Sequence, residues 1–172
     1  MRSIFYNHPL QYQIEIDGEN WTQGEKIKGE LTVRNMISET VFVKDSQVIM
    51  AYGLKKNFKA RNESNWEVFE KQVLTKNIPL HAGTEQSYEW NFQLETDCPI
   101  TDKHGGLYFL FGGEDVLSEG GRLDLPIRLH PILQNFLQTF TTQYFFLEKY
   151  QKRKSEWTEV KLIPPESKEF PN

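Results

Sequence analysis

Hydrophobic and polar residues alternate with a period of two through much of the chain. The alternation runs over residues 12–16, 27–33, 88–94 and 123–129. Successive side chains of a strand point to opposite faces, so each run predicts a strand with one buried and one solvated face. Burial on one side favours antiparallel sheets, whose outer faces meet water.

Three further segments, 41–52, 66–78 and 107–111, are rich in strand-forming residues but alternate less regularly. The last is apolar on both faces, which predicts a central strand. Turn signals separate the segments, among them the glycine pairs at 105–106 and 112–113. Many short strands between turns are typical of a sandwich. The sequence therefore predicts an all-β, antiparallel, immunoglobulin-like β-sandwich.

One segment has a helical period instead. Its apolar residues recur every three or four positions. They are Ile132, Leu133, Phe136, Leu137, Phe140 and Tyr144. Proline is tolerated in a first turn, so Pro131 suits the start of an amphipathic helix over about 131–147. We therefore expect a sandwich with this helix over residues 1–147, a charged linker over 148–156, a C-terminal strand over 157–165 and a tail over 166–172.

The C-terminal strand needs a neighbour, because unpaired buried backbone groups are costly. Two arrangements are open. The strand folds back onto the edge of its own sandwich, or it pairs with the same strand of a second molecule as a symmetric homodimer. Local closure costs less entropy than association, which favours the first.

Composition narrows the classes of function. The 172 residues suit one domain, and 20 Lys and Arg against 24 Asp and Glu give a net charge of −4. Nothing in that balance selects for nucleic acid. The single cysteine forms no internal disulfide and fits a reducing compartment. No apolar leader opens the chain, and no stretch approaches the roughly 20 residues of a membrane span. We therefore expect a cytoplasmic protein.

The candidate chemistry is sparse. His8, His81, His104 and His130 are scattered, and none stands at ligand spacing from another histidine or from Cys98. No nucleophile elbow, P-loop or dinucleotide fingerprint occurs. We therefore expect no metal, no cofactor and no enzymatic activity.

The loop over residues 53–65 is the candidate for a partner contact. It is long, and it combines positive charge with apolar side chains, which is typical of interaction surfaces. A solvated hairpin tip is the plainer alternative. The candidate contact residues are Leu54, Lys55, Lys56, Phe58, Lys59 and Arg61.

Order and spacing of these segments resemble a known family. Residues 21–33, WTQGEKIKGELTV, resemble an early strand pair of the arrestin-like family, and residues 88–94 resemble a later strand that enters a proline-containing loop. Residues 129–131, Leu-His-Pro, and the helix after them are similar to a segment of bacterial sporulation-control (SpoOM-type) proteins, as is the strand at 158–164. Those families usually carry two sandwiches, and this chain is long enough for one. The resemblance implies an arrestin-like fold and an adaptor or scaffold role without chemistry. It also implies that the loop at 53–65 corresponds to the arrestin loop that inserts into a receptor.

Taken together, the sequence predicts a non-catalytic protein–protein interaction module that binds through loops and an open sheet edge. A carbohydrate- or small-ligand-binding sandwich is the first alternative, and Trp21 and Trp66 exposed together on a concave face would support it. A hydrolase is the second, and converging carboxylates or histidines in a deep pocket would support that.

Overall fold

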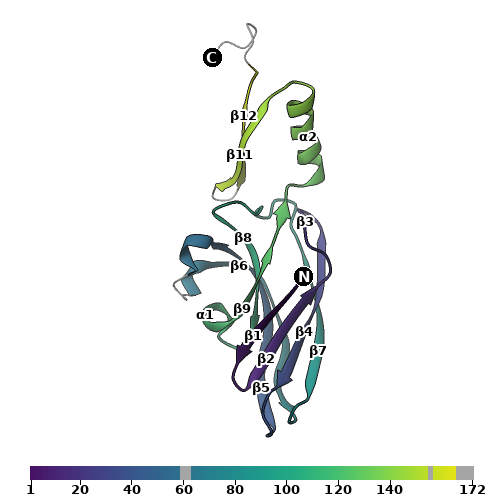
Figure 1. Ribbon diagram of the computed structural model, residues 1–172, viewed down its shortest axis with the longest axis vertical. Helices are drawn as coiled ribbons and strands as arrows, with labels where there is room; N and C mark the ends of the chain where they lie inside the picture. The colour runs from purple at the N-terminus through teal and green to yellow at the C-terminus, as the bar shows by residue number, and fades with distance from the viewer. Residues whose placement is uncertain (59–62, 155–156, 166–172) are drawn as a thin grey trace.

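Two antiparallel four-stranded sheets pack face to face, and a helix with a β-hairpin stands beyond one end of them (Figure 1). The computed structural model describes residues 1–58, 63–154 and 157–165. This arrangement confirms the predicted all-β antiparallel sandwich with a helix near the C-terminus.

The first sheet has the order β1-β2-β4-β7. Its strands are β1 (Arg2–Asn7), β2 (Leu10–Ile16), β4 (Lys26–Asn35) and β7 (Glu85–Gln93). All three pairings are antiparallel. The alternation in the sequence places every second side chain of β2 in the core and leaves its neighbours on the outer face, as the period of two predicts.

The second sheet has the order β6-β5-β8-β9. Its strands are β5 (Val41–Leu54), β6 (Trp66–Leu80), β8 (Gly105–Gly112) and β9 (Gly121–Leu125). Strand β8 is buried along its whole length and lies between β5 and β9, which confirms the prediction of a central strand.

The main core fills the space between the sheets. Its centre is aromatic, with the ring of Phe109 4.7 Å from Trp90 and 5.1 Å from Phe92, centroid to centroid. A smaller cluster covers the outer face of the second sheet, beneath the short helix α1 (Val116–Glu119). Because this cluster buries the outward side chains of β5 and β8, these strands lack the regular alternation of the first sheet.

A short parallel pairing of β3 (Trp21–Thr22) with β10 (Ile127–Arg128) closes one end of the sandwich. The chain then enters α2 (Pro131–Thr142), where His130 caps the helix by accepting a hydrogen bond from the backbone N–H of Ile132 at 3.3 Å. No described helix is both long enough and apolar enough to cross a membrane.

The C-terminal part differs from three expectations. The helix ends at Thr142 instead of 147. The predicted charged linker at 148–156 is largely the strand β11 (Leu147–Lys154), which pairs antiparallel with β12 (Trp157–Ile163). Strand β12 therefore does not join the sandwich edge, because its backbone partner is the neighbouring strand β11. Pairing with the same strand of a second molecule stays a prediction. The predicted tail at 166–172 lies outside the described residues.

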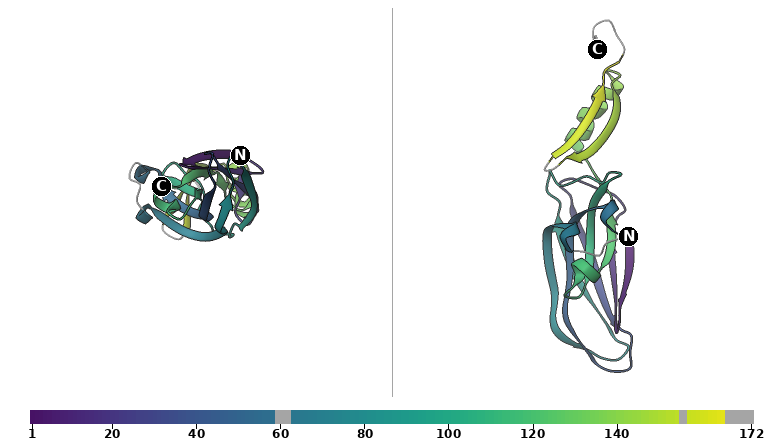
Figure 2. Two further views of the ribbon diagram at one scale, coloured as in Figure 1. Left: turned by 90° about the horizontal axis from the view of Figure 1, so that it is seen from below. Right: turned by 90° about the vertical axis from the view of Figure 1, so that its left-hand side faces the viewer.

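The hairpin covers one side of α2, and Figure 2 shows the two as a separate layer beyond the sandwich. Val160 and Leu162 of β12 pack around Leu137 of α2, together with Ile100 and Leu129 at the end of the sandwich. This third small core joins the helix and the hairpin to the rest of the molecule.

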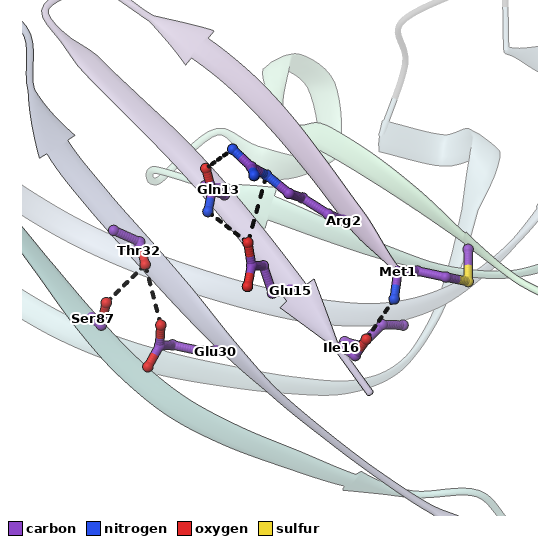
Figure 3. Close-up of polar contacts among 8 residues, drawn as sticks. All are labelled: Met1, Arg2, Gln13, Glu15, Ile16, Glu30, Thr32 and Ser87. Atoms are coloured by element: carbon purple, nitrogen blue, oxygen red, sulfur yellow. Dashed lines mark hydrogen bonds and ion pairs between the residues drawn. The ribbon is translucent and has the colours of Figure 1, made fainter. Parts of the chain in front are cut away.

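The outer face of the first sheet is polar (Figure 3). Arg2 donates a 2.7 Å hydrogen bond to Gln13 and forms a 3.5 Å ion pair with Glu15. Across β4 and β7, the hydroxyls of Thr32 and Ser87 lie 2.7 Å apart. Cross-strand polar pairs of this kind stabilise a solvated sheet face.

Candidate partner-binding surface

The structure separates the predicted contact residues into three groups. Lys55 and Lys56 are exposed on a short 3-10 helix, Lys55–Asn57, that follows β5. Leu54 and Phe58 on either side of them are half-buried. Lys59 and Arg61 lie outside the described residues.

Phe58 turns toward the protein instead of toward a partner. Its ring stacks on Trp66 with centroids 5.4 Å apart and meets Tyr108 edge-on at 5.0 Å. The guanidinium carbon of Arg122 lies 4.0 Å from the centroid of the same ring. These contacts make Phe58 part of the cluster on the outer face of the second sheet, and they hold the start of the loop against that sheet.

The lysines instead line a cleft of about 300 Å³ at the end of the second sheet. Its lining residues are Leu54, Lys55, Lys56, Lys103 and His104. We call this site the basic cleft. Two loops that lie about fifty positions apart in the sequence build it, and the backbone N–H of Lys55 joins them by donating to the carbonyl of His104 at 2.8 Å.

Asp102 organises the second of these loops. Its carboxylate accepts hydrogen bonds from the backbone N–H groups of His104 and Gly105 at 2.6 and 2.9 Å. Its other oxygen accepts the backbone N–H of Arg153 at 3.2 Å. The Asp102 carboxylate is thus occupied by backbone donors, and no carboxylate is among the described residues that line the basic cleft.

The ammonium groups of the cleft differ in their partners. Lys55 donates to the carbonyl of Asp102 at 3.0 Å, so its position is fixed. In the described part of the chain, neither Lys56 nor Lys103 forms an ion pair. Two cations are therefore left for an external anionic group, beside the apolar side chain of Leu54.

Sequence reasoning found half of this cleft. No local pattern in the sequence connects Lys103 and His104 with the loop at 53–65. The register of β5 with β8 does so by placing Leu54 opposite Gly105. The Asp102-x-His104-Gly105 turn before a buried strand was the one local signal for this contact.

A reactive thiol finds no support in the geometry. Cys98 is buried, and burial, with the charges of Asp97 and Glu95 adding to it, raises the pKa of its thiol to about 12. A thiol with so high a pKa is a poor nucleophile near neutral pH. Among the described residues, no group of three or more histidine, cysteine, aspartate and glutamate side chains could hold a metal ion.

The aromatic arrangement proposed for a carbohydrate site is also missing from the described surface. Trp21 is buried in the main core, and Trp66 packs beneath Phe58. The tryptophan that is most exposed is Trp157 on the hairpin, 61% exposed.

A groove of about 780 Å³ crosses the outer face of the first sheet. It contains a row of three glutamates, in which Glu30 stands directly opposite both Glu15 and Glu89. Like charges in register destabilise a sheet. Arg2, opposite Glu15 on β1, compensates one end of the row, and Lys26 and Lys28 of β4 line the same groove.

No protein-family model and no curated protein matches the sequence. Among solved structures, Spo0M, a sporulation control protein from Bacillus subtilis, has a TM-score of 0.69 at 13% identity, with 92% of this chain and 68% of that chain covered. The C-terminal domain of wzt has a TM-score of 0.42 at 9% identity, with 75% and 79% covered. A β-glucosidase from Listeria innocua has a TM-score of 0.41 at 11% identity, with 69% and 16% covered. The first of these shows that the chain shares its fold with Spo0M, as the resemblance to SpoOM-type proteins predicted.

Proposed function

We propose that this chain is a non-catalytic protein-interaction module that binds an acidic segment of a partner protein at the basic cleft. The observation that carries the proposal is the convergence of Lys55, Lys56 and Lys103 around a cleft without a carboxylate in its lining. The role is that of an adaptor or scaffold, and the compartment that we infer is the cytoplasm.

The chemistry of the cleft favours a partner with acidic and apolar groups side by side. The unpaired cations of Lys56 and Lys103 attract negative charge and raise the rate of encounter. Leu54 offers an apolar contact at the same place. The fixed ammonium of Lys55 and the hydrogen-bonded turn at Asp102 keep the cleft in shape, which lowers the entropy cost of binding.

A sheet edge lies next to this loop and extends the proposed surface. Strand β6 pairs with β5 on one side and has no sheet partner among the described strands on the other. Val68, Phe69 and Val73 are exposed along it. An extended partner segment could add to such an edge by backbone hydrogen bonds.

Assignment to the arrestin-like family belongs to this proposal. The order of strands and the segments at 21–33 and 88–94 support it, and so does the fold shared with Spo0M. An adaptor role without chemistry follows from that assignment.

Charge reversal tests the cleft. A Lys56→Glu, Lys103→Glu double variant should bind a fluorescent glutamate-rich peptide at least tenfold more weakly than the wild type. It should also lose partner proteins that the wild type retains in affinity capture from cells. The matched control is Lys149→Glu, Lys161→Glu, which makes the same change in net charge on exposed positions of the hairpin β11–β12. Equal binding by both double variants would exclude the basic cleft.

A further inference from the structure

One apolar face of α2 lies open to solvent. We call it the α2 stripe: Ile132, Leu133 and Phe136 are exposed on the helix, Phe140 is half-buried, and Tyr144 is exposed just beyond the helix end at Thr142. Ile132 is 71% exposed, Phe136 57% and Tyr144 58%. The rings of Phe136, Phe140 and Tyr144 follow one another with centroids 4.8 and 5.8 Å apart, so the stripe is continuous along the helix.

The rest of the molecule gives this helix little burial. Leu137 is its one buried residue, where α2 meets Val160 and Leu162 of the hairpin. A helix of 12 residues is marginal in water on its own, and tertiary packing supplies most of the stability of such helices. The α2 stripe is therefore apolar surface that a further contact would cover, as large exposed apolar patches usually are.

We propose that a second copy of this chain covers the α2 stripe, with the two helices antiparallel about a two-fold axis. No charged residue occurs from position 131 to position 147. Two copies of the helix therefore meet without like-charge repulsion, although 26% of the whole chain is charged.

Two cations of the hairpin point away from this pairing. Lys152 and Lys154 both form ion pairs with Glu159, at 3.6 and 3.2 Å. Glu159 neighbours Val160 on β12, and neighbouring strand residues point to opposite faces. Since Val160 faces α2, this charged cluster lies on the far face of the hairpin.

The stripe is self-complementary in an antiparallel arrangement. With the two-fold axis near Gln138, Ile132 of one helix lies opposite Tyr144 of the other, and Phe136 opposite Phe140. Aromatic side chains bury 150–250 Å² each, so the exposed part of the stripe amounts to on the order of 500 Å² per copy. A standard interface buries roughly 800 Å² per partner, which the uncharged Gln and Thr side chains beside the stripe would complete.

The position of α2 leaves room for a second copy. The helix stands beyond the end of the sandwich in each side view, with the hairpin on one side of it (Figures 1 and 2). Two molecules can therefore join through their helices while both sandwiches remain free.

Light scattering coupled to size-exclusion chromatography tests the proposal on the full chain. The wild type should elute as a dimer at tens of micromolar and dissociate on dilution. Phe136→Lys should raise the dissociation constant at least tenfold, because two lysines would be buried in an apolar contact. Tyr6→Lys is the matched control, a similarly exposed aromatic residue on β1, and it should leave the dimer intact.

A pair of variants with opposite charges tests the register in which the two helices pair. Ile132→Glu and Tyr144→Lys should each weaken self-association, and a mixture of the two variants should form a mixed dimer in which the new charges face each other. Circular dichroism checks that each variant keeps its secondary structure. A wild type that stays monomeric up to several hundred micromolar would overturn the proposal, and so would a dimer that Phe136→Lys leaves unchanged. Neither result bears on partner binding at the basic cleft, which the Lys56→Glu, Lys103→Glu variant tests.

Discussion

Arg153 of β11 stacks on Tyr52 of β5, with its guanidinium carbon 4.1 Å from the centroid of the ring. The same guanidinium forms two hydrogen bonds to Glu67 of β6, at 2.9 and 3.0 Å. The Arg153 side chain is only 12% exposed. A planar guanidinium can stack and bind a carboxylate in two places at once, which a lysine cannot do. Arg153 therefore fastens the hairpin to the sandwich.

Arg153→Ala should lower the free energy of unfolding by about 2 kcal/mol, because it removes both the stacking and the paired hydrogen bonds. Glu67→Gln should cost less than about 1 kcal/mol, since Glu67 is largely exposed and the stacking on Tyr52 remains. Urea denaturation measures both values. Hydrogen exchange should locate the loosening produced by Arg153→Ala in residues 147–163. Equal losses in the two variants would mean that the stacking contributes nothing.

Phe58→Ala should lower the free energy of unfolding by about 2 kcal/mol, roughly half the cost of a fully buried phenylalanine, because the ring is half-buried between Trp66 and Arg122. The Lys56→Glu, Lys103→Glu variant should leave stability nearly unchanged, since both side chains are exposed. Thermal denaturation separates the two cases. Replacing Phe58 is therefore a poor test of partner binding, because any loss of binding would be accompanied by a loss of structure.

Glu30→Lys should raise stability by about 0.5–1 kcal/mol at low ionic strength, because a lysine there would face Glu15 and Glu89 across the strands. The gain should shrink in about 0.5 M salt, where screening is strong. Glu85→Lys is the control, since Glu85 stands opposite Arg34 and its reversal creates repulsion instead. The idea fails if both substitutions shift the urea midpoint in the same direction.

The sequence pattern predicted those strands of the sandwich in which burial alternates from one residue to the next. Ile14, Leu31 and Phe92 are core residues, and their neighbours are solvated, so the strands of the first sheet could be read directly. The central strand β8 was recognised from its apolar residues on both faces. In each case hydrophobicity and burial agree.

The errors fall where burial does not follow hydrophobicity. Arg153 is nearly buried although it lies in a run of charged residues. The charge of that run predicts a solvated linker, whereas the structure has the strand β11 there. Phe58 lies in a polar loop, so the sequence predicts an exposed side chain. In the structure, Tyr108 and Arg122, which are distant in the sequence, cover its ring. The pairing of Lys55 with His104 depends on sheet register, which local spacing does not contain.

The buried thiol makes stability depend on pH in a defined window. Burial first, and the charges of Asp97 and Glu95 second, raise the pKa of Cys98 from 9.0 to about 12. Between these values the unfolded chain releases the proton and the folded chain keeps it. The contribution is therefore fully present below pH 9 and is lost as the pH rises toward 12. At pH 10 the loss should reach about 1 kcal/mol relative to pH 8.

Cys98→Ala removes this titration and leaves the other titrating groups in place. Its own cost of lost packing is independent of pH, so the difference in unfolding free energy between the wild type and Cys98→Ala should shrink by about 1 kcal/mol from pH 8 to pH 10. Urea denaturation of both proteins under reducing conditions measures that difference at each pH. Parallel curves over this range would show that the thiol of the folded protein titrates as it does in the unfolded chain. Alkylation by iodoacetamide at pH 8 should agree, with rapid labelling in urea and slow labelling of the folded wild type, because the thiolate is the reacting species.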